Sequence, residues 1–512
     1  VLASTACVGL AIGSVLSGLR DDESVATMQT RGIGVVFEQP WAVVRVHGHR
    51  EDAEERQDPP RSGGDHVARG YRVRHGVPAE RRQRRAHHAG IVAELRCQNS
   101  RRIPGRDLSQ SCQGADRRLA QAAAEHIGAG EGHPEVLVYK NNVDGKGRSY
   151  GAHENYLVAR SLDFEELTAV LLPFFAARQV LVGAGRVGLG PAGERPGFQL
   201  SQRADYFEEP VGLETTIHRP IVNTRDEPHA RPEAYRRLHV IIGDATLSQH
   251  ATWLRMGMTA LVLAMAEAGT APRLTLDDPV AALQTISHDP GLRATVPLLE
   301  RTADGPVRRH WTGLQILRSY LDAARAHCAA FGVTDPQTRE VLEAWAIDLD
   351  DATADPLSLS DRADWAAKLR VLEGLRARTG ADWTDPRLAM VDLQYADLRP
   401  ARSLHRRLVA AGALRTLADE AEIRAAVATP PRATRAWTRG NLVGRHGDRV
   451  AGAAWETLLL RGAGERVHRL HLAEPLVGAA VDLPGWWEDA AAPRPDDEAL
   501  VATLPPLFGA RA

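Results

Sequence analysis

The alternation of apolar and polar positions predicts a well-patterned globular domain from residue 119 onward. Apolar residues recur at helical spacing over residues 163–181, 246–268, 309–331, 336–348 and 361–378. Asp163 is suited to cap the first of these helices, and Pro173 is expected to kink it. The second helix is predicted to stop at Gly269, and its methionines are expected to fill the core. Loops are expected at 269–272 and 351–356.

One predicted strand carries polar residues on a face that would usually be apolar. Residues 136–139 are typical of a strand, and residues 144–147 of a tight turn. If the chain is extended at 153–155, His153 and Asn155 share a face, because side chains alternate along a strand. A buried strand seldom places an imidazole and an amide inward unless a polar group lies there. A solvent-exposed polar hairpin is the alternative interpretation.

A second segment, residues 235–244, repeats the pattern with Arg237 and His239 on one face. Arginine binds phosphate through its planar fork, and neutral imidazole coordinates divalent metals. Together the two strands predict a concave sheet face that holds a nucleotide and its metal. For either strand alone, an exposed polar face on an antiparallel sheet is the more common explanation.

Residues 1–118 differ in character from the rest of the chain. The run 81–106 contains eight arginines, no lysine and no clear helical or strand period, and residues 51–70 also lack an apolar face. We consider three explanations: translation in the wrong reading frame, a divergent or disordered region, and a nucleic-acid-binding arm. The near absence of aromatic residues makes nucleic acid an unlikely partner. Residues 1–19 lack a basic start and a strongly apolar span, so neither a signal peptide nor a membrane anchor is expected.

Composition narrows the classes of function. The 512 residues carry a net charge of −2, 44% are hydrophobic, and the four cysteines are scattered, so a soluble cytoplasmic protein without a disulfide scaffold or zinc site is expected. The segment Gly183-Ala-Gly185-Arg-Val-Gly188 matches the spacing of a dinucleotide-binding loop. That fingerprint requires a helix at its third glycine, and the Gly- and Pro-rich residues 189–197 exclude one.

Four segments carry a family resemblance: YKNNVDGKGRSYGAHENYL (139–157), GRVGLGPAGERPGFQLSQRADY (185–206), NTRDEPHA (223–230) and RRLHVIIGDA (236–245). Together they resemble the Pup deamidase/depupylase (Dop) family, which is sister to the Pup ligases and related to glutamine synthetase. The resemblance runs from about residue 119 to 484. It implies an α/β (α+β) fold, in which a large domain has a curved, mainly antiparallel sheet backed by helices, plus a small C-terminal domain.

The resemblance also implies site residues and cofactors. His153 and His239 resemble magnesium ligands of the family, and Asn155 and Arg237 resemble its ATP contacts. From the segment 434–440, Arg435, Trp437 and Arg439 are candidates for closing the nucleotide pocket, with an ordinary packed turn as the alternative. The candidates are therefore two metal ligands, His153 and His239, and five nucleotide contacts: Asn155, Arg237, Arg435, Trp437 and Arg439. The implied cofactors are ATP and Mg²⁺.

The chain departs from the family at its acidic residues. The family pattern G-x-E-x-E-Y-G, whose glutamates bind magnesium, does not occur, nor does Y-V-D-H-A-H-P-E-Y, which carries the catalytic aspartate. The catalytic residue is therefore unassigned. Magnesium prefers oxygen ligands, so two imidazoles cannot form its whole site.

The resemblance predicts an ATP- and magnesium-dependent hydrolase that deamidates the C-terminal glutamine of Pup and removes Pup from lysines of conjugated proteins. The alternatives are a catalytically impaired relative that binds nucleotide or Pup, and a Pup–protein ligase. The expected partners are Pup and pupylated proteins, and a monomer is favoured. The predicted organisation is an atypical segment 1–118, a nucleotide-binding domain 119–429, a small domain 430–490 and a tail 491–512.

Overall fold

The structure is a computed structural model, and it describes most of the chain after residue 135. The described ranges are 136–145, 147–214, 218–226, 230–431, 434–447, 449–461, 467–473 and 475, with strands β1 (Val35–Val36), β2 (Val43–Val46) and β3 (Leu95–Arg96). The interpretations offered for residues 1–118, apart from these strands, and for the tail 491–512 lie outside the described residues.

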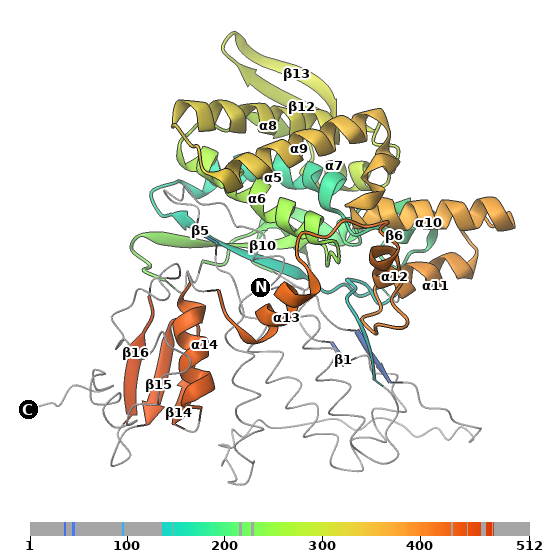
Figure 1. The fold of residues 1–512 in the computed structure, drawn as a ribbon. Helices are drawn as coiled ribbons and strands as arrows, with labels where there is room; N and C mark the ends of the chain where they lie inside the picture. Colours follow the sequence, from blue (N-terminus) through green and yellow to red (C-terminus); the bar gives the residue numbers. More distant parts are fainter. Residues whose placement is uncertain are drawn as a thin grey trace, which may run out of the picture.

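A five-stranded sheet lies at the centre of the molecule, in the order β3-β5-β10-β9-β8 (Figure 1). Strands β5 (Ala152–Ala159), β10 (Tyr235–Gly243) and β9 (Arg219–Asn223) pair antiparallel. At the two edges, β3 and β8 (Phe207–Gly212) join in parallel. The predicted mixed α/β class is confirmed. The sheet is antiparallel only at its centre, and the curvature expected of it stays a prediction.

Two buried helices cover one face of this sheet. Helix α5 (Phe164–Val182) begins where the Asp163 carboxylate accepts hydrogen bonds from two backbone amides, as predicted, and α6 (Gln249–Glu267) begins at the cap Ser248. An outer layer of α8 (Gly313–Ala330) and α9 (Pro336–Ala354) packs on them. Because α5 and α6 lie between the sheet and this layer, both are buried around most of their circumference.

Two of the predicted boundaries are wrong. Residues 309–312 belong to strand β13 (Gly305–Thr312), since Thr312 forms a capping box that starts α8 only at Gly313. The loop expected at 351–356 is helical as far as Ala354, and the helix ends before Pro356, which cannot continue it. The kink expected at Pro173 stays a prediction.

The remaining elements surround this core. They are β4 (Val136–Tyr139), β6 (Arg186–Leu189), β7 (Arg195–Gln199), β11 (Leu274–Leu276), β12 (Thr295–Thr302), α7 (Pro279–Ser287), α10 (Asp364–Thr379), α11 (Pro386–Tyr395), α12 (Leu404–Ala410) and α13 (Glu420–Ala428). Strands β6 and β7 form a hairpin, so no helix opens at Gly188 and the dinucleotide fingerprint is excluded, as predicted. Among the described residues, no helix is both long and apolar enough to span a bilayer.

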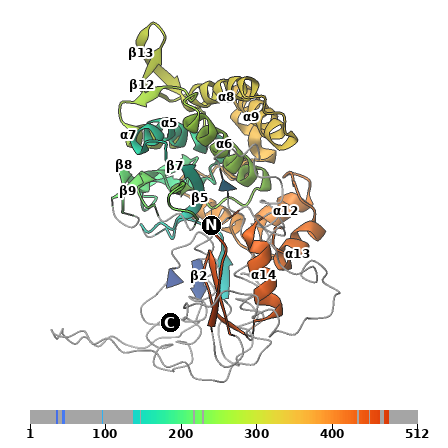
Figure 2. The ribbon, with the colours of Figure 1, turned by 90° about the vertical axis from the view of Figure 1, so that its left-hand side faces the viewer.

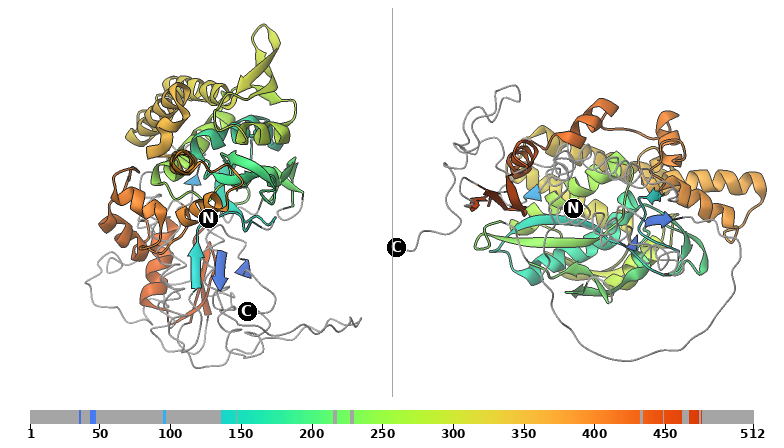
Figure 3. Two further views of the ribbon diagram at one scale, coloured as in Figure 1. Left: turned by 90° about the vertical axis from the view of Figure 1, so that its right-hand side faces the viewer. Right: turned by 90° about the horizontal axis from the view of Figure 1, so that it is seen from below.

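The C-terminal elements form a small unit of their own. Helix α14 (Arg435–Arg445) packs on a sheet of β14 (Val450–Ala453), β15 (Thr457–Arg461) and β16 (Val467–His471) through a four-residue apolar cluster. Figures 1, 2 and 3 show this unit on the side of the central sheet away from α5 and α6. The domain boundaries at 118, 429 and 490 stay predictions.

Candidate functional site

The polar face of β5 and β10 brings four of the predicted residues together. Antiparallel pairing places His239 directly opposite Asn155. The rings of His153 and His239 lie edge to face with centroids 4.8 Å apart. The Asn155 side-chain oxygen accepts a hydrogen bond from Arg237 Nη1 at 3.2 Å and lies 3.1 Å from His239 Nδ1. The geometry therefore supports a shared site, while the roles of these residues as metal and nucleotide ligands stay predictions.

The hydrogen bond to Asn155 fixes the proton on His239. An amide oxygen only accepts, so Nδ1 of His239 carries the hydrogen and Nε2 keeps its lone pair. Nε2 is buried and has no hydrogen-bond partner among the described residues. Burial, assisted by Arg237, lowers the pKa of His239 to about 3. Burial and then the neighbouring His239 hold the pKa of His153 well below its usual value. Both imidazoles are therefore neutral near pH 7 and able to donate a lone pair.

Two further arginines on this side of the sheet were not predicted. Arg203 is almost fully buried; its Nε donates to Ser149 Oγ at 3.0 Å, and its guanidinium also bonds the Ile241 carbonyl. Arg219 donates to the Ser149 carbonyl at 3.3 Å. Burial, followed by repulsion from Arg219, lowers the pKa of Arg203 to about 9. Arg203 lies within the family segment 185–206, but it precedes a short 3-10 turn. The alternation of side chains along a strand therefore could not predict where Arg203 points.

The charged side chains that act on the two imidazoles from the described residues are cationic: Arg203, Arg225 and Arg237. Arg203 and Arg237 are buried and Arg225 is exposed. Guanidinium groups close to the two imidazoles fit a polyanion such as a nucleotide phosphate chain. It does not by itself fit a complete magnesium site. The described residues contain no group of three or more His, Cys, Asp or Glu side chains placed to hold a metal ion. Since magnesium takes mainly oxygen ligands, these donors supply at most one side of its shell.

The asparagine-rich loop before β5 is hydrogen-bonded to the loop that follows β10. The Asn142 side chain accepts from the Ala245 amide at 2.7 Å and donates to the Tyr150 carbonyl at 2.8 Å. The predicted turn is present, with Gly145 and Gly147 at φ of 68° and 84°. Asn142 thus ties the loop that leads into β5 to the loop that leaves β10. It stabilises the arrangement of the two strands.

The three C-terminal candidates make their described contacts within their own small unit. Arg435 Nη1 donates to the Leu472 carbonyl at 3.0 Å. Arg439 Nη1 donates to two carbonyls of the β14–β15 turn, at 3.1 and 3.0 Å, and its guanidinium lies 4.8 Å from the centre of the Trp455 ring. The Trp437 carbonyl accepts from Asn441 at 2.8 Å. None of the contacts described here for these three residues reaches the imidazole pair, and their nucleotide role stays a prediction.

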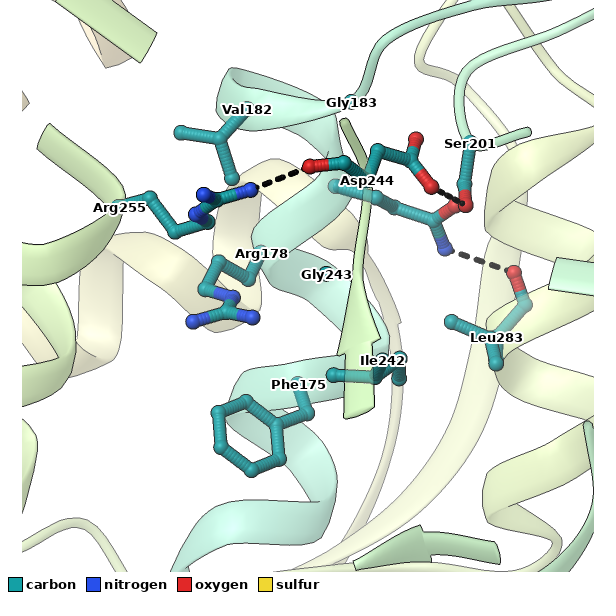
Figure 4. A pocket seen from close by; sticks show the side chains of 11 residues that line it. Phe175, Arg178, Val182, Gly183, Ser201, Ile242, Gly243, Asp244, Arg255 and Leu283 are labelled. Atoms are coloured by element: carbon teal, nitrogen blue, oxygen red, sulfur yellow. Dashed lines mark hydrogen bonds between the residues drawn. The ribbon is translucent and has the colours of Figure 1, made fainter. Parts of the chain in front are cut away.

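Two cavities among the described residues do not include the two imidazoles. The first, of about 20 Å³, lies behind the end of β10, where the Asp244 carboxylate accepts from Ser201 Oγ at 2.9 Å and Arg255 Nη1 donates to the Asp244 carbonyl at 2.5 Å (Figure 4). The second, of about 390 Å³, lies beside α12 and is lined in part by Arg406 and Arg407.

Comparison with known proteins identifies the family. Residues 109–459 match the family described as "Pup-ligase protein". This chain belongs to the Pup ligase family. Two relatives within it are similar over most of their length. A "Pup deamidase/depupylase" of Mycobacterium tuberculosis (strain CDC 1551 / Oshkosh) is 47% identical over 370 residues, covering 71% of this chain and 72% of the relative. A "Depupylase" of Acidothermus cellulolyticus (strain ATCC 43068 / DSM 8971 / 11B) is 49% identical over 347 residues, covering 67% and 68%.

The fold of this Pup ligase family member also matches a solved structure. The Pup ligase PafA in complex with ADP aligns with a TM-score of 0.64 and 32% sequence identity, over 74% of this chain and 81% of PafA. The family assignment made from the four sequence segments is therefore confirmed. The bound ADP of PafA also agrees with the coarser expectation that the family binds nucleotides.

Proposed function

We propose that this chain is an ATP- and magnesium-dependent hydrolase that deamidates the C-terminal glutamine of Pup and cleaves Pup from the lysines of its conjugates. Relatives named for these two activities are 47–49% identical to it. The observation that carries the proposal is the polar face of β5 and β10, where Arg237 donates to Asn155 beside two neutral imidazoles 4.8 Å apart. Such a face is built to bind a phosphate chain and not the apolar body of a small ligand.

In this proposal the chain's own residues hold and orient the nucleotide. Arg237 and Arg203 bind phosphate oxygens, because guanidinium groups donate paired hydrogen bonds to them. Asn155 uses its oxygen for Arg237 and His239 in the described hydrogen bonds, so its NH₂ group is the part that would donate to the ligand. His153 and His239 present lone pairs on the metal side. Magnesium, when bound, neutralises phosphate charge and polarises an oxygen.

We assign the role of nucleophile to no residue of this chain. The described residues place no group of carboxylates beside the imidazoles, and the acidic family patterns do not occur in the sequence. This observation favours a second candidate, a relative that binds nucleotide or Pup without turning Pup over. A third candidate, Pup–protein ligation, has the support of the ligase PafA, which shares the fold.

One set of assays separates the three candidates. The full chain is incubated with ATP, magnesium and Pup ending in glutamine, and the Pup product is followed by mass spectrometry. Conversion of the terminal glutamine to glutamate, and release of Pup from a lysine conjugate, are the expected results. Binding of Pup or ADP without either product would favour the impaired relative. Attachment of Pup ending in glutamate to a lysine protein would favour the ligase and remove the hydrolase.

A further inference from the structure

A buried ionic network lies directly behind the imidazole pair. Glu154 stands between His153 and Asn155 in β5, so its side chain points to the opposite face, where it is fully buried. The Arg178 guanidinium on α5 donates to both carboxylate oxygens, at 2.8 and 2.9 Å. Tyr156 Oη donates to the same carboxylate at 2.6 Å. One carboxylate thus joins the strand that carries two site residues to the helix behind it.

Arg255 extends the network to β10. From α6, its Nε lies 3.5 Å from Glu154 Oε1, and its Nη1 donates to the carbonyl of Asp244, the residue that follows the strand. Figure 4 shows the side chains of Arg178 and Arg255 next to each other, with Arg255 directed to Asp244. The fit is close, since a Cβ added at Gly243 would lie 2.6 Å from Glu154 Oε1. The network therefore contacts both strands of the site at a β-bulge, where β10 shifts register against Ala152.

Stability alone does not require such a network. Well-packed apolar residues of similar volume are often as stabilising as a buried ion pair, because removing charges from water is costly. Other residues on this sheet face are apolar, with Val158, Leu238 and Val240 in the core. What hydrogen bonds to a carboxylate add over apolar contacts is a fixed direction and distance. The network also holds two guanidinium groups against one carboxylate.

We propose that Glu154, Arg178 and Arg255 are positioning residues, which hold β5 and the end of β10 at the separation that lets His153, Asn155 and His239 bind a nucleotide together. This inference rests on the proposed nucleotide site, but not on the hydrolytic reaction. A variant that loosens the network should therefore weaken nucleotide binding beyond what its loss of stability explains.

The test compares Glu154→Gln with a matched control in the full chain. The control is Asp348→Asn, which removes the charge from a similarly buried carboxylate on the outer helix α9. Asp348 is paired with Arg362 at 2.7 Å and with His250 at 2.7 Å, and it does not contact β5 or β10 in the described hydrogen bonds. Both variants should lower the melting temperature. ADP affinity, measured by calorimetry, should fall about tenfold or more in Glu154→Gln and stay within twofold of the unmodified chain in Asp348→Asn. Equal ADP affinity in all three proteins would overturn the proposal.

A second variant and a second measurement keep the test decisive if Glu154→Gln does not fold or if the chain does not act on Pup. If Glu154→Gln does not fold, Tyr156→Phe removes the 2.6 Å hydrogen bond to the carboxylate, together with the 3.1 Å contact of the hydroxyl with Met256 Sδ, and should weaken ADP binding by about threefold. Hydrogen exchange, read on peptides covering β5 and β10, should be faster in both variants than in Asp348→Asn, even without nucleotide. Unchanged exchange in these strands would count against the network. A chain that binds ADP but leaves Pup ending in glutamine unchanged would remove the proposed hydrolase and leave this inference standing.

Discussion

His239 should make the protein less stable in acid, and its replacement should remove that effect. Burial and then Arg237 lower its pKa to about 3, whereas the unfolded chain titrates at about 6.5. The folded state therefore disfavours the protonated ring. The stabilising contribution is fully present above pH ~6.5 and falls as the pH drops toward about 3. With these two pKa values, the linkage relation gives a loss of about 2 kcal/mol between pH 7.5 and pH 5.0.

The assay is urea unfolding of the unmodified chain and of His239→Gln at the two pH values. Between pH 7.5 and 5.0 the variant should lose about 2 kcal/mol less unfolding free energy than the unmodified chain. His405→Gln is a matched control, because burial and then Lys140 lower the pKa of His405 to about 3 as well, and His405 lies outside the site, on helix α12. It should give a similar relief in acid.

Nucleotide binding distinguishes the two histidines. His239→Gln should weaken ADP binding at pH 7.5, because the Nε2 lone pair is lost and the hydrogen bond to Asn155 changes. His405→Gln should leave ADP affinity within twofold. If His239→Gln loses as much stability in acid as the unmodified chain, the ring is not held neutral by burial, and the argument for two lone-pair donors on this face fails.

Three further outcomes are expected. Gly243→Ala should lower the unfolding free energy by about 1–3 kcal/mol, because its Cβ would overlap Glu154 Oε1; unchanged urea unfolding would show that the contact relaxes freely. Arg203→Met should lower the unfolding free energy by about 1–3 kcal/mol, because Ser149 and the Ile241 carbonyl lose a buried donor. It should also weaken ADP binding, most of all at low salt. An ADP affinity equal to that of the unmodified chain at every salt concentration would contradict a phosphate-binding role for Arg203. Removing magnesium with a chelator should abolish deamidation of Pup ending in glutamine, and full activity without a divalent ion would remove magnesium from the proposal.

Local pattern in the sequence was sufficient for the helices that cover the sheet and for the face that each site residue occupies. Alternation along a strand placed His153 with Asn155, and Arg237 with His239, because the two-residue period is a property of the extended backbone. Capping residues such as Asp163 located a helix start for the same local reason. The boundaries at 309–312 and 351–354 were wrong, because there strand pairing and helix packing prevailed over apolar spacing.

The tertiary structure alone decided which faces meet. The register of β5 against β10 sets His239 opposite Asn155, and no periodicity in either strand encodes that pairing. Arg203 and Arg255 reach the site region from segments distant in the chain. Glu154 has buried partners only because helices α5 and α6 pack against its strand. A sequence records which side chains share a strand face. The distances between strands, and the burial that keeps His239 neutral, arise only when the whole core packs.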